Sequence, residues 1–195
     1  MNVLLLGPQG SGKGTQAKRI ATDLEIPHVA TGDMIRAMKE EETDLGRELK
    51  AVYDRGDLVP DDLMIRLIED RLRRSDAGEG FVLDGFPRTM AQAEALDDLL
   101  RRLGRKLDVV FEFKVPDRET LMQRIIKRVR EEHRSDDTPE AIERRLKLYY
   151  DETEPLVEYF RSRYGNVVGI HADRSIDDVY REIQESLEQV DGHHP

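Results

Sequence analysis

The chain has 195 residues, of which 37% are charged, and its formal net charge at pH 7 is −10. This length predicts a single domain with a core large enough to carry insertions. A strongly acidic chain binds nucleic acid and anionic membranes poorly, so we expect neither as a partner. The chain contains no cysteine, which excludes disulfides, thiolate zinc sites and cysteine nucleophiles and fits a cytoplasmic protein.

Short apolar runs predict buried strands. Residues 2–6 (NVLLL) are apolar without alternation, which is typical of a strand buried on both faces of a parallel sheet and unlike a signal peptide. Similar runs follow at residues 28–30, 81–83, 109–113 and 167–170. Helical patterns separate the runs, and none is long enough to cross a membrane. The alternation predicts an α/β fold in which helices cover both faces of a five-stranded parallel sheet.

Capping residues mark three helix starts. Asp117 is expected to open a helix that extends to about residue 130. Thr138 before Pro139 is a typical N-cap followed by proline at the first helical position. Ser175, followed three residues later by an aspartate, resembles a capping box and opens the last helix.

Two segments differ from simple connections between a strand and a helix. Residues 32–56 are rich in charge and helical in pattern, and they follow the second strand as an insertion. Residues 129–137 (VREEHRSDD) form a polar connection between two long helices.

Residues 7–15 (GPQGSGKGT) nearly match the phosphate-loop pattern G-x-x-x-x-G-K-[ST], but a glycine stands where the hydroxyl residue is expected. Three glycines allow backbone N–H groups to turn inward around an anion: Gly10, Gly12 and Gly14. Lys13 adds a point charge, and the following helix adds its positive end. The flanking strand and helix favour phosphate binding over a bare glycine-rich turn, and Thr15 is within reach of a phosphate-bound magnesium ion.

A second motif ends the strand at residues 81–84 (FVLD). Asp84 lies at the carboxyl edge of a parallel sheet, where open α/β sheets bind ligands. An acid at a strand end is by itself as consistent with a turn. Beside a phosphate loop, it is expected to hold magnesium directly or through water.

Several sequence blocks together carry a family resemblance. The loop GPQGSGKGTQ, with a strand that ends in DGFPR, resembles the nucleoside monophosphate kinases, and the adenylate kinases most closely. Further blocks similar to the family follow in its order: ATGDMIR at 30–36, GDLVPD at 56–61, RSDDTPEAIERRL at 134–146 and YYDETEPL at 149–156. Glycine after the lysine is the residue typical of that family. The chain departs from the family at Ala30, where serine is usual, and at Gln9, where proline is more common.

The resemblance implies a P-loop NTPase-like three-layer sandwich formed by residues 1–195 as one domain. An AMP-binding insertion is expected at residues 31–59 and a short lid at residues 128–138. Only nine residues, 129–137, connect the helices that flank the lid, which leaves no room for the hairpin that carries zinc in some long-lid relatives. We therefore expect Mg²⁺ bound with ATP and no structural zinc.

The resemblance also implies roles for individual residues. The ATP site is expected to comprise Gly10, Ser11, Gly12, Lys13, Gly14, Thr15, Arg124, Arg128 and Arg174. The AMP site is expected to comprise Thr31, Arg36, Asp57, Leu58, Val59, Gly85, Phe86, Pro87, Arg88, Gln92, Arg134 and Arg145. The catalytic side chains are expected to be Lys13, Arg88, Arg128, Arg134 and Arg145, with Asp84 at the metal.

The arginines suit a site for two phosphorylated substrates. Guanidinium groups bind phosphate oxygens bidentately and remain protonated. Arg124 and Arg128 lie four residues apart on one predicted helix and are expected to point the same way. No general base is required, because a phosphate monoester with a second pKa of about 6 is already ionised. The isolated residues His28, His133 and His171 are interpreted as structural or surface side chains.

Three functions remain in competition. The first is reversible, in-line, magnesium-assisted phosphoryl transfer from ATP to AMP, giving two ADP, by a monomer. The second is a UMP/CMP-type kinase; Thr31, Thr89 and Gln92 favour AMP, since a glutamine amide both donates to and accepts from an adenine edge. The third is a non-catalytic nucleotide switch, which would not need the acceptor-side residues Arg36 and Arg88.

Overall fold

The structure, a computed structural model, describes residues 1–132 and 136–191. The centre of this part of the chain is a sheet whose neighbouring strands all run parallel, in the order β2-β3-β1-β4-β5. The strands are β1 (Asn2–Leu6), β2 (His28–Ala30), β3 (Phe81–Asp84), β4 (Val109–Lys114) and β5 (Val167–His171). All five predicted strands are confirmed, and the last three end one residue later than predicted.

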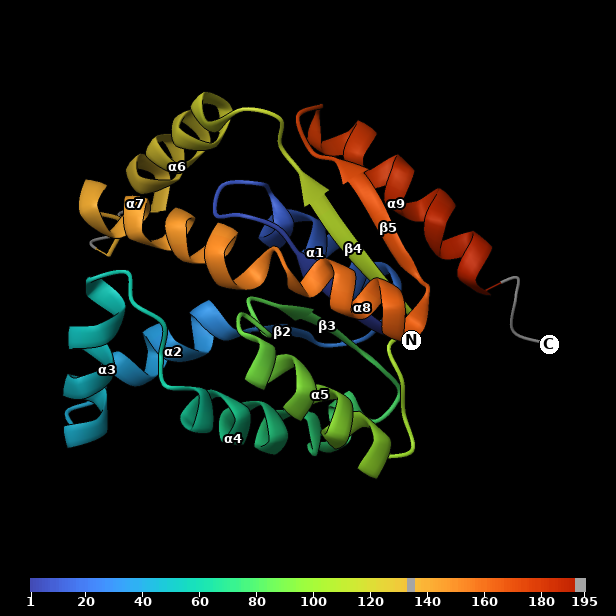
Figure 1. Ribbon diagram of the computed structural model, residues 1–195, viewed down its shortest axis with the longest axis horizontal. Helices are drawn as coiled ribbons and strands as arrows, with labels where there is room; N and C mark the ends of the chain where they lie inside the picture. The colour runs from blue at the N-terminus through green and yellow to red at the C-terminus, as the bar shows by residue number, and fades with distance from the viewer. Residues whose placement is uncertain (133–135, 192–195) are drawn as a thin grey trace.

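Helices connect the strands (Figure 1). They are α1 (Lys13–Asp23), α2 (Thr31–Lys39), α3 (Asp44–Asp54), α4 (Asp61–Leu72), α5 (Met90–Arg102), α6 (Arg118–Glu132), α7 (Pro139–Leu148), α8 (Leu156–Tyr164) and α9 (Ile176–Asp191). A 3₁₀ turn (Ser75–Ala77) follows α4, and a π-helical turn (Tyr149–Thr153) joins α7 to α8. Among the described residues, no helix has the length and apolar character needed to span a bilayer.

Helices pack on both faces of the sheet, which confirms the predicted three-layer α/β fold. On one face, Ile20 of α1 and Ile183 of α9 are buried against Phe111 of β4. On the other face, Leu96 of α5 and Phe160 of α8 belong to a second, larger core that includes α4. In Figure 1, α9 lies along β5, while α4 and α5 lie below the strands. Burial of apolar side chains on both faces stabilises the sheet.

The strand order brings the two sequence motifs together. β1 lies between β3 and β4, and Leu5 of β1 pairs with Asp84 of β3. The glycine-rich loop therefore leaves β1 beside the carboxylate that ends β3. After β1, the chain adds β2 and β3 on one side of β1 and then β4 and β5 on the other, so the strand order reverses at β1. Open α/β sheets bind ligands at such a point.

The predicted helix starts are confirmed. Asp117 accepts a hydrogen bond from the N–H of Thr120 at 2.7 Å. Thr138 Oγ1 accepts from the N–H of Ala141 at 3.2 Å. In the last case Ser175 Oγ accepts from the N–H of Asp178 at 3.2 Å, while its hydroxyl donates to the same residue's carboxylate at 2.6 Å.

The predicted connection at residues 129–137 is partly wrong, because α6 continues to Glu132. Val129 packs with Leu121 and Ile125 in a small core, and Lys127 pairs with Glu131 at 3.7 Å, one turn further along the helix. These contacts support helix where polarity alone suggested a loop.

The insertion after β2 is helical, as predicted, and consists of α2 and α3. Thr43 caps α3 by accepting from the N–H of Gly46 at 2.9 Å. Leu49 and Tyr53 are buried on one side of α3 and extend the larger core. The insertion thereby lies over the edge of the sheet that begins with β2.

Candidate functional site

The loop between β1 and α1 has the geometry of an anion cradle. Gly10 and Gly12 adopt left-handed conformations, with φ of 85° and 90°, that favour glycine. Gly12 is the N-cap of α1, whose first turn carries no acidic side chain, so no residue of the helix itself opposes its positive end. A side chain at Gly14 would come within 3.6 Å of Oδ2 of Asp84, which shows how closely loop and carboxylate approach.

Lys13 lies across this loop. Its Nζ donates to the carbonyl oxygens of Gly7 at 2.6 Å and of Pro8 at 2.9 Å, and Oγ of the buried Ser11 is 3.4 Å away. Burial lowers the pKa of Lys13 to about 8, although Asp84 opposes part of this effect. The ammonium group is therefore charged at neutral pH and loses its charge under mildly alkaline conditions.

We predict that affinity for ATP falls as the pH rises through 8. With a pKa of about 8, Lys13 remains protonated in only about a tenth of the free molecules at pH 9, so phosphate binding loses an attractive charge. Asp84, Arg88 and Arg128 act electrostatically on Lys13. ATP titrations between pH 6.5 and 9.5 would test this. A Lys13→Met variant should give a flat profile, and an equal decline in that variant would contradict the assignment.

Asp84 ends β3 with a carboxylate that is 16% exposed. Burial raises its pKa, but His28, Lys13 and Arg88 outweigh burial, and the net pKa lies below its usual value. Nε2 of His28 lies 3.4 Å from Oδ2 of Asp84. The sequence, from which His28 was interpreted as a structural or surface residue, did not indicate that it would lie beside Asp84. Pairing of β2 with β3 brings it there, a long-range contact that its own neighbours in sequence do not reveal.

The chemistry of these donors fits a magnesium ion that arrives with ATP. Mg²⁺ is usually bound through one or two carboxylates together with substrate phosphates. Asp84 is ionised at neutral pH beside the loop, and Thr15 is exposed in the first turn of α1. Within the described residues, no group of three or more His, Cys, Asp or Glu side chains is arranged to hold a metal by itself.

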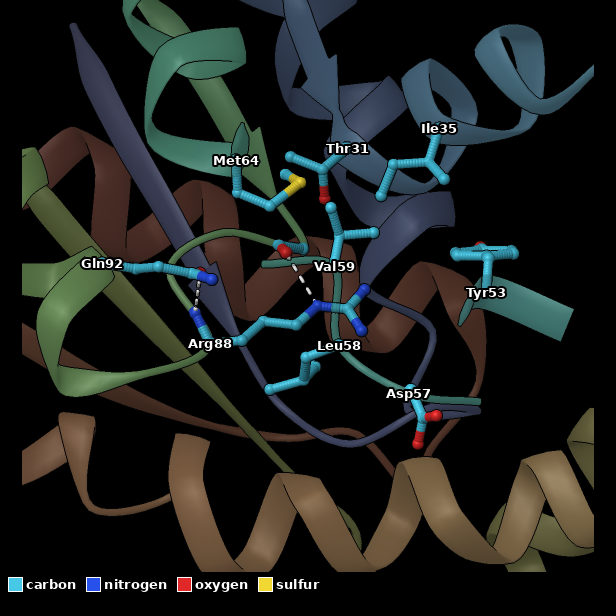
Figure 2. Close-up of a pocket in the computed structure, with 10 residues that line it drawn as sticks. Thr31, Ile35, Tyr53, Asp57, Leu58, Val59, Met64, Arg88 and Gln92 are labelled. Carbon is cyan, nitrogen blue, oxygen red and sulfur yellow. Dashed lines mark hydrogen bonds between the residues drawn. The ribbon is translucent and has the colours of Figure 1, made fainter. Parts of the chain in front are cut away.

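A pocket lies between the insertion and the turn after β3 (Figure 2). Its lining comprises Thr31, Ile35, Tyr53, Asp57, Leu58, Val59, Met64, Gly85, Arg88 and Gln92. Seven of these ten are residues that the family resemblance assigns to the AMP site. Ile35, Tyr53 and Met64 were missed, because buried residues at helical spacing are indistinguishable from ordinary core positions in the sequence.

The floor of the pocket depends on a glycine. Gly85 has φ of 87°, and a Cβ there would lie 2.4 Å from Oγ1 of Thr31. Thr31 in turn donates to the carbonyl oxygen of Asp84 at 3.3 Å, which joins the pocket to the end of β3. Phe86 and Pro87 are buried and do not line the pocket, so their side chains shape the turn.

Gln92 is held in a fixed orientation in the pocket wall. Its Oε1 accepts from the N–H of Arg88 at 2.8 Å (Figure 2). Its Nε2 donates to Oδ1 of Asp61 at 2.7 Å. Thr89 caps α5 and donates to the same oxygen of Asp61 at 3.0 Å. Nε2 can donate one further hydrogen bond and Oε1 can accept one further hydrogen bond, so the side chain offers a donor beside an acceptor.

Arg88 and Arg36 bring positive charge to the pocket. Nε of Arg88 donates to the carbonyl oxygen of Gly85 at 2.8 Å. Burial lowers the pKa of Arg88, and repulsion from Arg145 and Arg36 adds to this effect, against stabilisation by Tyr53. Arg36 donates to the hydroxyl of Tyr53 at 2.9 Å and also pairs with Asp33. Positive charges that repel one another create a strong demand for an anion.

Asp137 joins the glycine-rich loop to the helices beside the predicted lid. Its fully buried carboxylate pairs with Arg128 of α6 and with Arg145 of α7, both at 2.5 Å. Gln9 donates to it from the glycine-rich loop at 2.7 Å, so the residue that departs from the usual proline has a specific contact. Two of the four predicted catalytic arginines thus meet at one carboxylate. Another of the four, Arg134, lies outside the described residues.

Arg124 and Arg174 gather elsewhere, at the turn between β5 and α9. Nη1 of Arg124 donates to the carbonyl oxygen of Ala172 at 2.6 Å. Nε of Arg174 donates to the carbonyl oxygen of His171 at 3.2 Å, and its guanidinium pairs with Glu182. Arg124 and Arg128 share a face of α6 but contact different partners. β5 ends near Arg124, whereas the segment before α7 lies near Arg128.

The segment before α4 contacts α7 closely. Gly56 has φ of 78°, and a Cβ there would lie 2.5 Å from the carbonyl oxygen of Ala141. Asp57 pairs with Arg55 at 3.0 Å and with Arg144 of α7. The pocket and the helix that follows the predicted lid are therefore in direct contact.

Comparison with known proteins agrees with this arrangement. A family model described as adenylate kinase matches residues 5–164. Among curated proteins, the chain is similar to an adenylate kinase of Cyanothece sp. (strain PCC 7425 / ATCC 29141), with 45% identity over 97% of this chain and 96% of the relative. An adenylate kinase of Thermobifida fusca (strain YX) is 47% identical over 96% and 98%. One of Stenotrophomonas maltophilia (strain K279a) is 45% identical over 92% and 95%. By these matches, the chain belongs to the adenylate kinase family.

Proposed function

We propose that this protein catalyses reversible transfer of the γ-phosphoryl group from ATP to AMP, giving two molecules of ADP. One observation carries the proposal: a phosphate loop and a separate acceptor pocket lie at the same edge of the sheet, with Arg88 close to both. The charge of Arg88 acts on Lys13 of the loop, and the charge of Arg36 of the insertion acts on Arg88. Such an arrangement suits two phosphorylated substrates that meet end to end.

In the proposed reaction, the protein positions the substrates and neutralises charge. Loop N–H groups and Lys13 bind the donor phosphates. Arg88 and Arg36 bind the acceptor phosphate, which attacks in line without a general base because it is already ionised. Arg128 and Arg145 stabilise the negative charge on the transferring phosphoryl group. Magnesium held with the help of Asp84 would add neutralising charge at the donor phosphates.

The base of the acceptor is proposed to be read by Gln92. Its remaining donor and acceptor capacities match the N1 acceptor and the N6 amino donor of adenine. Asp61 and the N–H of Arg88 fix the orientation of the Gln92 amide. Rotating the amide so that its oxygen and nitrogen exchange places would break both hydrogen bonds. The same order of groups rejects a base that presents a carbonyl oxygen and an N–H there.

A coupled assay that offers AMP, CMP, UMP and GMP separately with MgATP tests the function. Phosphorylation of AMP well above the other three supports the proposal. Preference for CMP or UMP would favour the pyrimidine-type kinase. Binding of ATP without phosphorylation of any acceptor would support the nucleotide switch and overturn the proposal.

We further propose that residues 31–59 form an AMP-binding insertion and residues 128–138 a short lid, in a cytoplasmic monomer. Closure of the lid would exclude water, which otherwise competes with AMP for the phosphoryl group.

We predict that Arg134 and Arg145 contact the transferring phosphoryl group only in the closed state. Arg145 here pairs with Asp136 and Asp137, so it must exchange a carboxylate for phosphate when the substrates bind. A crystal structure with a ligand that joins two adenosines through a phosphate chain would test this. Both guanidinium groups should lie on the phosphate chain, and exposure of both to solvent would contradict the prediction.

A further inference from the structure

We propose that Tyr53 is a positioning residue that holds Arg36 and Arg145 in place for phosphate. This inference rests on the proposed function, since it assigns both arginines to the reacting phosphates. Tyr53 lies in the last turn of α3 and lines the acceptor pocket opposite Arg88 (Figure 2). Neither the loop nor the other family blocks include it.

Three contacts connect Tyr53 to the two arginines. Its hydroxyl accepts from Nη1 of Arg36 at 2.9 Å. The guanidinium carbon of Arg145 lies 4.8 Å from the centre of its ring, within the range of a cation–π contact. Its backbone carbonyl also accepts from Nη2 of Arg145 at 2.9 Å. One residue of the insertion thus contacts an arginine of α2 and an arginine of α7.

The chemistry of a tyrosine suits this position. Arg36, Arg88 and Arg145 repel one another, and Arg88 is destabilised by the other two. Arg36 already pairs with Asp33, and Arg145 with Asp136 and Asp137. A neutral phenol attracts these cations through its ring and its oxygen without adding a further carboxylate that would compete with the substrate phosphates, so it orders the arginines without neutralising them. Such preorganisation lowers the entropic cost of binding.

Ordinary core packing does not account for these contacts. Tyr53 is 7% exposed, and Leu49, one turn earlier, already supplies an apolar side chain to the core. Lys39 lies 5.3 Å from the same ring, so a third cation approaches it. A leucine or phenylalanine would fill comparable space but would lose the oxygen or the aromatic face.

Two substitutions separate the contacts. Tyr53→Phe removes only the hydroxyl and should raise KM for AMP about 3- to 10-fold, with kcat and KM for ATP unchanged. Tyr53→Leu also removes the ring and should lower kcat by a further factor of about 10, because Arg145 loses its aromatic support. Tyr159→Phe is the control. It removes the hydroxyl of a half-buried tyrosine, which donates to Asp97 at 2.6 Å and lies away from the pocket, and it should leave both constants unchanged.

The route through Arg36 is tested by combining Tyr53→Phe with Arg36→Ala. The double variant should have the same KM for AMP as Arg36→Ala alone, and independent effects would overturn the inference. A lower melting temperature with unchanged kinetic constants would also overturn it, since Tyr53 would then serve only the fold. Failure of the wild-type protein to phosphorylate AMP would instead refute the proposed function, so the two failures are distinguishable.

Discussion

Replacing Lys13 with methionine is expected to lower turnover by about three orders of magnitude or more with the fold retained. Nζ of Lys13 is the charged group of the loop, and it donates to the carbonyl oxygens of Gly7 and Pro8. Phosphate would take the place of these carbonyls. Methionine has a similar length but offers no charge or donor, so loss of activity would report lost stabilisation of the transferring group.

The fold should tolerate this change for an electrostatic reason. Burial lowers the pKa of Lys13 to about 8, so the native environment disfavours its charged form. The unfolded state keeps the higher pKa, which makes the charged lysine a cost to stability below pH 8. Removal of the charge should therefore leave the free energy of unfolding unchanged or larger, as urea titration would show.

The control for this experiment is Lys18→Met, on an exposed position of the same helix. It should turn over at nearly the wild-type rate. Comparable activity of Lys13→Met and Lys18→Met in well-folded preparations would contradict the role assigned to Lys13.

Arg88→Ala is expected to lower turnover by about 10³- to 10⁵-fold, the effect of losing an arginine that stabilises a phosphoryl transition state. Arg88 lies in the acceptor pocket, feels the charges of Asp84, Arg36 and Arg145, and is bonded through Nε to Gly85. No other guanidinium among the described pocket-lining residues could replace it. Its removal also relieves repulsion within the cluster, so stability should not decrease.

Steady-state kinetics with varied AMP would measure this effect, together with a melting curve. Arg101→Ala is the matched control, because Arg101 is 69% exposed and pairs only with Asp98 of its own helix in the described structure. A well-folded Arg88→Ala protein with turnover close to that of Arg101→Ala would rule out the proposed role.

Local sequence patterns predicted elements whose signals lie within a few residues. The apolar run NVLLL is buried at every position in β1, and Thr138 caps α7 as expected. The end of α6 was predicted too early. The polar residues there continue the helix, because the neighbouring turns of α6 pack against α7. Polarity reports exposure to water, whereas the end of a helix depends on what packs against it.

The candidate site divides in the same way. Gly85 and Gln92, which the family resemblance assigned to the AMP site, both line the pocket, and Gly85 belongs to the contiguous block DGFPR. His28 beside Asp84 was not expected, because that proximity depends on the pairing of β2 with β3. The spacing of Tyr53 from Leu49 indicates a buried helix face but does not identify the groups that the face will meet.

Local residue patterns were enough to establish the alternation of strands and helices, the glycine-rich loop and the family to which the chain belongs. Each of these depends on residue types at short, fixed spacing. Which polar groups meet became known only from the packed fold: Asp137 with Arg128 and Arg145, and Tyr53 with Arg36. Such contacts join residues that are far apart along the chain or on different helices. They follow from the order of strands and the packing of helices, which a local pattern does not specify.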